Sequence, residues 1–107
     1  MSAPIIIFRG DTRVLEIPIV DAAGVPVDVT NWTFVLSLAL VRGQTPAVQV
    51  DGTIVDAAGG LVQFELTPIE TAAVGNYYYD VQGTTPAPER VYTVDFGRIH
   101  IVQDVSP

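Results

Sequence analysis

The sequence predicts an all-β protein, an immunoglobulin-like antiparallel β-sandwich of about seven to nine short strands with one short helical turn near residues 68–74. Turn residues recur about every ten positions, and the segments between them alternate apolar and polar side chains. Residues 75–83 show this best, because aromatic and β-branched residues lie between two glycines. The 107 residues are expected to form a single domain, residues 1–107.

The composition limits the possible functions. Hydrophobic residues make up 49% of the chain, which is enough to build a folded core, yet no apolar run approaches the ~20 residues of a membrane-spanning helix. The N-terminus has no basic, apolar leader, so no signal peptide is expected. Twelve acidic and five basic residues give a net charge of −7, which disfavours nucleic acid and anionic membranes as partners. Without cysteine, disulfides and thiolate metal sites are impossible.

Alternation along the chain predicts the strands and the faces that they bury. We expect strands over residues 5–8, 12–20, 33–41, 47–50, 53–55, 61–66, 75–83, 91–94 and 97–103. The strand over residues 33–41 is apolar on both faces, including Leu40, and should be central in its sheet. Asp51-Gly52 lies between two β-branched runs and predicts a tight hairpin. Residues 83–90, rich in proline and threonine, predict an exposed loop.

The segment before the tyrosine-rich strand predicts a tyrosine corner. Residues 67–74 are long enough for one helical turn that ends at Gly75. In sandwich proteins a tyrosine at the head of such a strand bonds its hydroxyl to the upstream backbone. We therefore assign Gly75 and Tyr77 as the structural corner, with Tyr79 and Val81 following Tyr77 into the core. Tyr78 then faces outward, where an aromatic side chain suits an interface.

No catalytic residue, metal ligand or cofactor site is predicted, so the protein is not expected to be an enzyme. The single histidine, His100, lies on the predicted outer face of the last strand and is too little for a catalytic triad or a zinc site. The aspartates mostly occupy turns, and their spacing fits no calcium-binding loop.

Several short segments of the sequence, taken together, are similar to those of a known protein family. They are Arg9-Gly10-Asp11-Thr12, residues 17–21, residues 24–30 with Trp32, residues 75–82, Tyr92-Thr93-Val94 with Gly97, and Asp104-Val105. In this order the chain resembles the small β-sandwich domains of tailed-bacteriophage virions, such as the N-terminal domain of the baseplate upper protein and related tail and decoration proteins.

The resemblance implies a virion structural protein, either a tail or baseplate adaptor or a head-decoration subunit. Such a protein is assembled in the host cytoplasm and docks onto other virion proteins as a homo-oligomer within a symmetric assembly. The alternative is a carbohydrate- or receptor-binding module on the virion surface that uses Trp32, Tyr78 and the 83–90 loop.

Three surfaces are candidates for binding a partner. Their residues are Ile5, Ile6, Ile7 and Phe8 at the N-terminus, Tyr78 on the tyrosine strand, and Pro86, Pro88 and Arg90 in the long loop. For residues 5–8 two alternatives remain open. An apolar terminal strand can add to a neighbouring subunit's sheet, or it can pair within its own domain and close the core.

Overall fold

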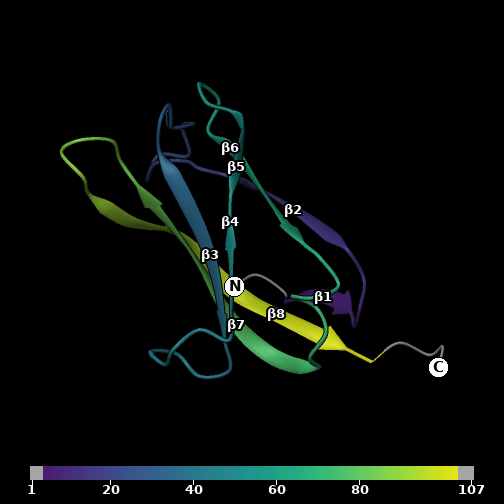
Figure 1. Cartoon of the computed structure of the whole chain (residues 1–107). Helices are drawn as coiled ribbons and strands as arrows, with labels where there is room; N and C mark the ends of the chain where they lie inside the picture. Colours follow the sequence, from purple (N-terminus) through teal and green to yellow (C-terminus); the bar gives the residue numbers. More distant parts are fainter. Residues whose placement is uncertain (1–3, 104–107) are drawn as a thin grey trace.

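The protein is a sandwich of two β-sheets (Figure 1). The structure is a computed structural model that describes residues 4–103. The larger sheet contains, in spatial order, β1 (Ile5–Phe8), β8 (Val91–Val102), β7 (Gly75–Thr84), β3 (Thr33–Ala39) and β4 (Val48–Asp51). The smaller sheet contains β2 (Arg13–Pro18), β6 (Leu61–Leu66) and β5 (Thr53–Asp56). The predicted all-β sandwich is confirmed, with eight strands and no helix among the described residues.

The core lies between the two sheets and contains the inward-facing residue of each alternating pair. Fifteen hydrophobic side chains are 7% exposed or less: Ile7, Leu15, Ile17, Ile19, Val29, Phe34, Leu36, Leu38, Val62, Phe64, Leu66, Tyr77, Val81, Ile99 and Ile101. β3 lies between β7 and β4, so its two apolar faces belong to an internal strand, as predicted. Burying these side chains is the main stabilising contribution to the fold.

β1 pairs within its own domain. It runs parallel to the end of β8, with Ile5 opposite Ile99 and Phe8 opposite Val102. The sandwich is therefore antiparallel except for this one pair of strands among those described. Of the two alternatives for residues 5–8, the structure has the second, in which the strand closes its own core.

The predicted hairpin at Asp51-Gly52 is wrong. β4 pairs with β3 in the larger sheet, whereas β5 pairs with β6 in the smaller one, so the chain crosses between sheets here. The amide of Gly52 donates a hydrogen bond of 2.8 Å to the carbonyl of Phe34. A Cβ at Gly52 would lie 2.8 Å from the ring of Phe64, so the glycine lets the chain pass close to the core.

Three predicted boundaries also differ from the structure. β3 ends at Ala39, and Leu40 is 57% exposed rather than buried, because the chain leaves the sheet there. Residues 91–94 and 97–103 belong to one strand, β8, which stays continuous through an irregularity opposite Val81 and Gln82. β7 continues to Thr84, so the loop that follows is shorter than the predicted 83–90 segment.

The tyrosine corner has the geometry expected from the sequence. Tyr77 is 5% exposed, and its hydroxyl donates a 3.0 Å hydrogen bond to the carbonyl of Ala73. The segment before it makes one helical turn, closed by the amide of Thr71 on the carbonyl of Thr67 at 3.1 Å, and does not extend into a helix. The hydroxyl of Thr71, which is fully buried, donates to the carbonyl of Asp11 at 2.8 Å. The corner is thereby attached to the β1–β2 connection.

The turn is also fixed by a carboxylate. One oxygen of Glu70 accepts hydrogen bonds from the hydroxyl of Thr67 at 2.6 Å and from its amide at 2.7 Å. These two hydrogen bonds hold the pKa of Glu70 below its ordinary value, because they favour the ionised carboxylate.

The two sheets differ in length, which makes the molecule elongated. β7 and β8 have 10 and 12 residues, whereas no strand of the smaller sheet exceeds 6. The molecule measures 47 × 26 × 26 Å. In Figure 1 the β7–β8 hairpin extends to the upper left, and the loop after β3 leaves the larger sheet at the lower left. The larger sheet is thus only partly covered by the smaller one.

Candidate interaction surfaces

The predicted partner-binding residues do not form one site, because they lie on three separated parts of the larger sheet. In β1, Ile7 is 2% exposed and Ile5 packs against the core. Ile6 and Phe8 alternate outward and are 46% and 47% exposed. Only these last two remain available to a partner.

The loop between β7 and β8 exposes Pro86, Pro88 and Arg90, as predicted. Its ends are held together by Thr85, whose amide donates to the carbonyl of Arg90 at 2.9 Å. The hydroxyl of Thr85 also accepts a 3.0 Å hydrogen bond from the amide of Arg90 and donates one of 3.1 Å to the carbonyl of Pro88. The loop therefore presents its prolines on a hydrogen-bonded frame at the end of the molecule.

Trp32 and Tyr78 lie on opposite sides of the larger sheet. The Trp32 ring packs against the core and lies between Phe34 and Tyr92, with ring centroids 6.0 and 6.1 Å away. Tyr78 alternates to the outer side, opposite Arg98 on β8, and is 38% exposed. The two rings therefore do not form the shared sugar-stacking platform that the sequence suggested as an alternative.

Tyr78 is instead the centre of a different cluster on the outer side of the larger sheet. The guanidinium of Arg42 lies 4.8 Å from the centroid of the Tyr78 ring and 6.0 Å from that of Phe96. Such cation–π contacts contribute about 0.5–1 kcal/mol at exposed sites and orient the arginine. Phe96 is 66% exposed although it lies in the middle of β8. We name the surface formed by Leu40, Arg42, Tyr78, Phe96, Arg98 and His100 the arginine–aromatic face.

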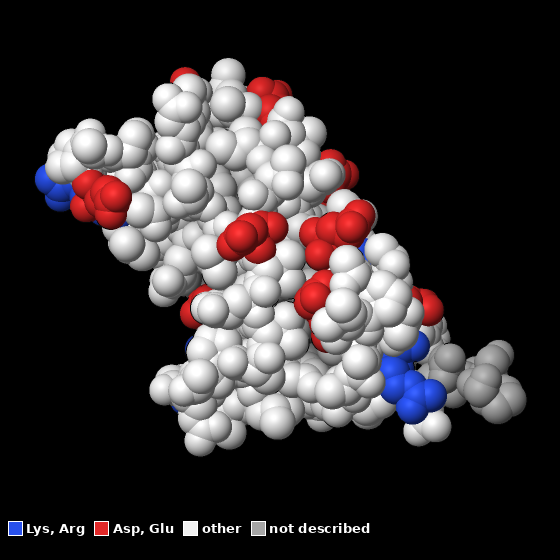
Figure 2. All heavy atoms as spheres, viewed as in Figure 1, with Lys and Arg blue, Asp and Glu red and all other residues white. Residues whose placement is uncertain are grey.

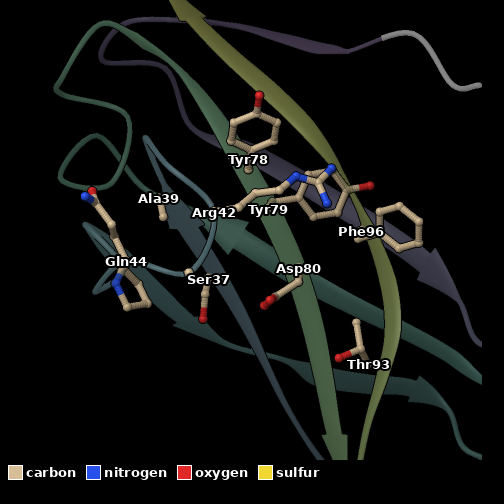
Figure 3. Close-up of a pocket in the computed structure, with 11 residues that line it drawn as sticks. Ser37, Ala39, Arg42, Gln44, Tyr78, Tyr79, Asp80, Thr93 and Phe96 are labelled. Carbon is tan, nitrogen blue, oxygen red and sulfur yellow. The ribbon is translucent and has the colours of Figure 1, made fainter.

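Two hollows flank Tyr78 on this face. The larger, about 480 Å³, lies between the outer surface of β3, β7 and β8 and the loop over residues 42–46. In Figure 3 Arg42 extends across it toward Phe96, while Asp80 points toward Ser37 and Gln44 projects from the loop. The smaller hollow, about 370 Å³, contains Asn76, Arg98 and His100. The face thus has a raised aromatic centre with a cavity on each side, a shape that can receive side chains of another molecule.

Tyr79 borders the larger hollow and also packs against the core, as the alternation along β7 predicts. Tyr79 is half-buried there, and its hydroxyl donates a 3.1 Å hydrogen bond to Oδ2 of Asp95. Burial raises the pKa of Tyr79 to about 12, with further contributions from the negative charge of Asp95 and from this hydrogen bond. The raised pKa favours the protonated Tyr79 hydroxyl, which is the form that donates to Asp95.

Sequence reasoning identified Tyr78 but missed Arg42, Phe96 and Arg98. For the two β8 residues the alternation of the strand was a sufficient signal. Ile99 faces the core, so residues 96 and 98 lie on the outer side together with His100. For Arg42 no sequence signal exists, because its position over Tyr78 depends on how the 42–46 loop folds back over the sheet.

Within residues 4–103, no group of three or more histidine, aspartate or glutamate side chains is arranged to hold a metal ion. The described chain has no helix that is long and apolar enough to cross a membrane.

The architecture is that of a small two-sheet β-sandwich domain in which the outer side of each sheet is uncovered. No protein-family model and no curated protein sequence matches the chain. Among solved structures, the N-terminal domain of phage TP901-1 ORF48 has the same fold, with a TM-score of 0.67 and 13% sequence identity. The match covers 95% of this chain and 86% of that one. The predicted resemblance to a phage β-sandwich domain is therefore confirmed for the fold. Asp104 and Val105, which were part of the resemblance, lie outside the described residues.

Proposed function

We propose that this protein is a structural domain of a tailed-bacteriophage virion that acts by docking onto other virion proteins, as a tail or baseplate adaptor or a head-decoration subunit. The main support for this proposal is the structural similarity to a phage domain, which covers 95% of this chain and 86% of the other. A match of this extent supports a shared architectural role. Because folds host many functions, the surfaces of this chain supply the second line of support.

The exposed apolar residues are consistent with a docking role. Ile6 and Phe8 on β1 and Phe96 on β8 are each at least 46% exposed, although all lie in regular strands of a well-packed sheet. Exposed aromatic and arginine side chains on a rigid scaffold are the typical anchors of protein interfaces. The protein would thus bind as a preformed unit and lose little conformational entropy on assembly.

The test is to locate the protein in purified particles. Virions are separated from free protein by density-gradient sedimentation, and an antibody against this chain is then used for negative-stain imaging. We expect the label at one repeated position on the tail, the baseplate or the head. The proposal is wrong if the protein is absent from purified particles of a phage that expresses it.

A second candidate function is saccharide binding on the virion surface, and the larger hollow is the observation that favours it. Phe96 offers an exposed ring in a hollow that is also lined by the polar side chains of Asp80, Gln44 and Thr93. Sugars bind with their apolar face on an aromatic ring and their hydroxyls on polar groups. An immobilised panel of bacterial cell-wall and capsular saccharides tests this. Binding that is lost in Phe96→Ala but kept in Tyr92→Ala, another exposed aromatic, would support it.

A further inference from the structure

The outer sides of the two sheets differ in their charges. The protein carries a net charge of −7 with only five basic residues, yet two of these, Arg42 and Arg98, lie on the arginine–aromatic face together with the single histidine. Within residues 4–103 neither arginine forms an ion pair, and the contacts of Arg42 are with aromatic rings. Asp80 is the carboxylate that lines this surface. The arginine–aromatic face is therefore locally cationic on an acidic protein, while Asp80 borders it and Asp51, opposite Val35, lies farther along the same side of the sheet.

The outer side of the smaller sheet has the opposite character. Its outward positions on β2, β5 and β6 are Val14, Glu16, Pro18, Thr53, Asp56, Leu61, Gln63 and Glu65. We name the surface formed by Val14, Glu16, Thr53, Gln63 and Glu65 the acidic face. Glu65 lies opposite Val14 and Glu16 opposite Gln63, so the two carboxylates are diagonal neighbours, with Cα atoms about 7–8 Å apart. Both are exposed and without an ion pair among the described residues. In Figure 2 most carboxylates in view lie on the upper and right side, where Figure 1 shows this sheet.

The two faces also match in their apolar content. Tyr78, Phe96 and Leu40 are exposed between the arginines, and Val14, 45% exposed, lies beside the carboxylates. An interface needs both parts, because apolar contact supplies most of the binding energy while charge complementarity selects the partner and its register. The two faces lie on opposite sides of the sandwich. One copy can therefore bind a neighbour through its arginine–aromatic face and a second neighbour through its acidic face.

We propose that the arginine–aromatic face binds the acidic face of a second copy of this chain, so that Arg42 and Arg98 pair with Glu16 and Glu65 of the neighbour. This proposal rests on the proposed function, because it gives the contact by which the domain would repeat within a virion. A head-to-tail contact of this kind generates a closed ring or an open stack, depending on the rotation between copies.

The test uses charge reversal and rescue. Sedimentation equilibrium of the full chain should show concentration-dependent association that weakens as salt is raised. Arg42→Glu/Arg98→Glu should weaken association at least tenfold, and so should Glu16→Arg/Glu65→Arg. A mixture of the two variants should associate again, because each offers the face that the other needs. All four positions are exposed, so the variants should stay folded, which circular dichroism checks.

Arg90→Glu is the matched control, because Arg90 is an exposed arginine on the β7–β8 loop, outside both faces. Association of this variant should equal that of the natural sequence. Equal weakening by Arg90→Glu would show a general effect of net charge and would overturn the proposal. Failure of the mixture to associate would overturn it as well.

The outcomes also separate this proposal from the proposed function. A chain that stays monomeric at all concentrations but is found in purified virions has a docking role without self-association, and only the present proposal is then wrong. A chain that associates as described but is absent from virions contradicts the proposed function alone. Saccharide binding that is lost in Phe96→Ala, in a chain that remains monomeric, would assign this face to a glycan instead.

Discussion

The two halves of the β7–β8 hairpin follow the same alternation of residues but lie in different surroundings. In the first half, Tyr77 is 5% exposed beneath the smaller sheet and bonded to the corner. Toward the tip of the hairpin, Tyr92 on β8, opposite Gly83, is 47% exposed although it alternates to the inner side, while Val81 on β7 is still fully buried. The difference shows that alternation selects a side of the sheet, whereas burial depends on whether a second layer covers that side.

The same distinction separates the inner and outer sides of the larger sheet. Phe64 fills the space between the sheets and is fully buried, whereas Phe96 lies on the outer side with no layer above it. The inner side therefore supports stability, and the outer side is free to carry function. The following predictions test this division, beginning with the largest expected effect.

Phe64→Ala should lower the free energy of unfolding by about 3–5 kcal/mol, because it leaves a large cavity between the sheets. Phe96→Ala should change it by no more than about 0.5 kcal/mol, because the ring is already in contact with water. Chemical denaturation of both variants measures the difference. Similar losses in the two variants would mean that the outer side is also covered in solution.

Ile7→Ala should cost about 2–5 kcal/mol and Ile6→Ala about 1 kcal/mol or less, although the two residues are adjacent in β1. Ile7 belongs to the core, and Ile6 faces outward. For the same reason, deletion of residues 1–8 should unfold the domain rather than leave a soluble sandwich. A folded truncated protein, judged by its thermal transition, would show that β1 is dispensable to the core.

Tyr77→Phe should cost about 1–2 kcal/mol, because the carbonyl of Ala73 loses its donor at a buried position. Tyr92→Phe is the control, since Tyr92 is largely exposed, and it should be close to neutral. The tyrosine corner would be unimportant to stability if both variants unfolded at the same denaturant concentration as the natural sequence.

Tyr79 should make stability depend on alkaline pH. Its pKa is raised from 10.0 to about 12 in the folded state, so its contribution is fully present below pH 10 and is lost as the pH rises toward 12. Unfolding measured across this range should show a small decline that is absent in Tyr79→Phe. The formation of tyrosinate, followed by ultraviolet absorbance, should include one group with a pKa of about 12 that is missing in Tyr79→Phe. A titration curve near pH 12 that is the same in Tyr79→Phe would contradict the raised pKa of Tyr79.

Much of the fold follows from the sequence alone. Alternation identified the buried faces of β2, β6 and the end of β8, including Leu15, Phe64 and Ile99, because each inward residue is flanked by outward ones. The glycine and tyrosine at the start of β7 indicated the corner, because its hydrogen bond joins residues only four apart in the chain. These features are local, so the sequence determined them.

The pairing of strands and the candidate site were decided by the tertiary structure. Asp51-Gly52 has the local chemistry of a hairpin, but the pairing of β4 with β3 and of β5 with β6 makes it a crossing between sheets. Likewise, Arg42 reaches Tyr78 and Phe96 from a loop 36 and 54 residues away in sequence. Strand partners and exposed faces depend on which layers cover which surfaces, and this is set by contacts between distant residues that no local pattern encodes.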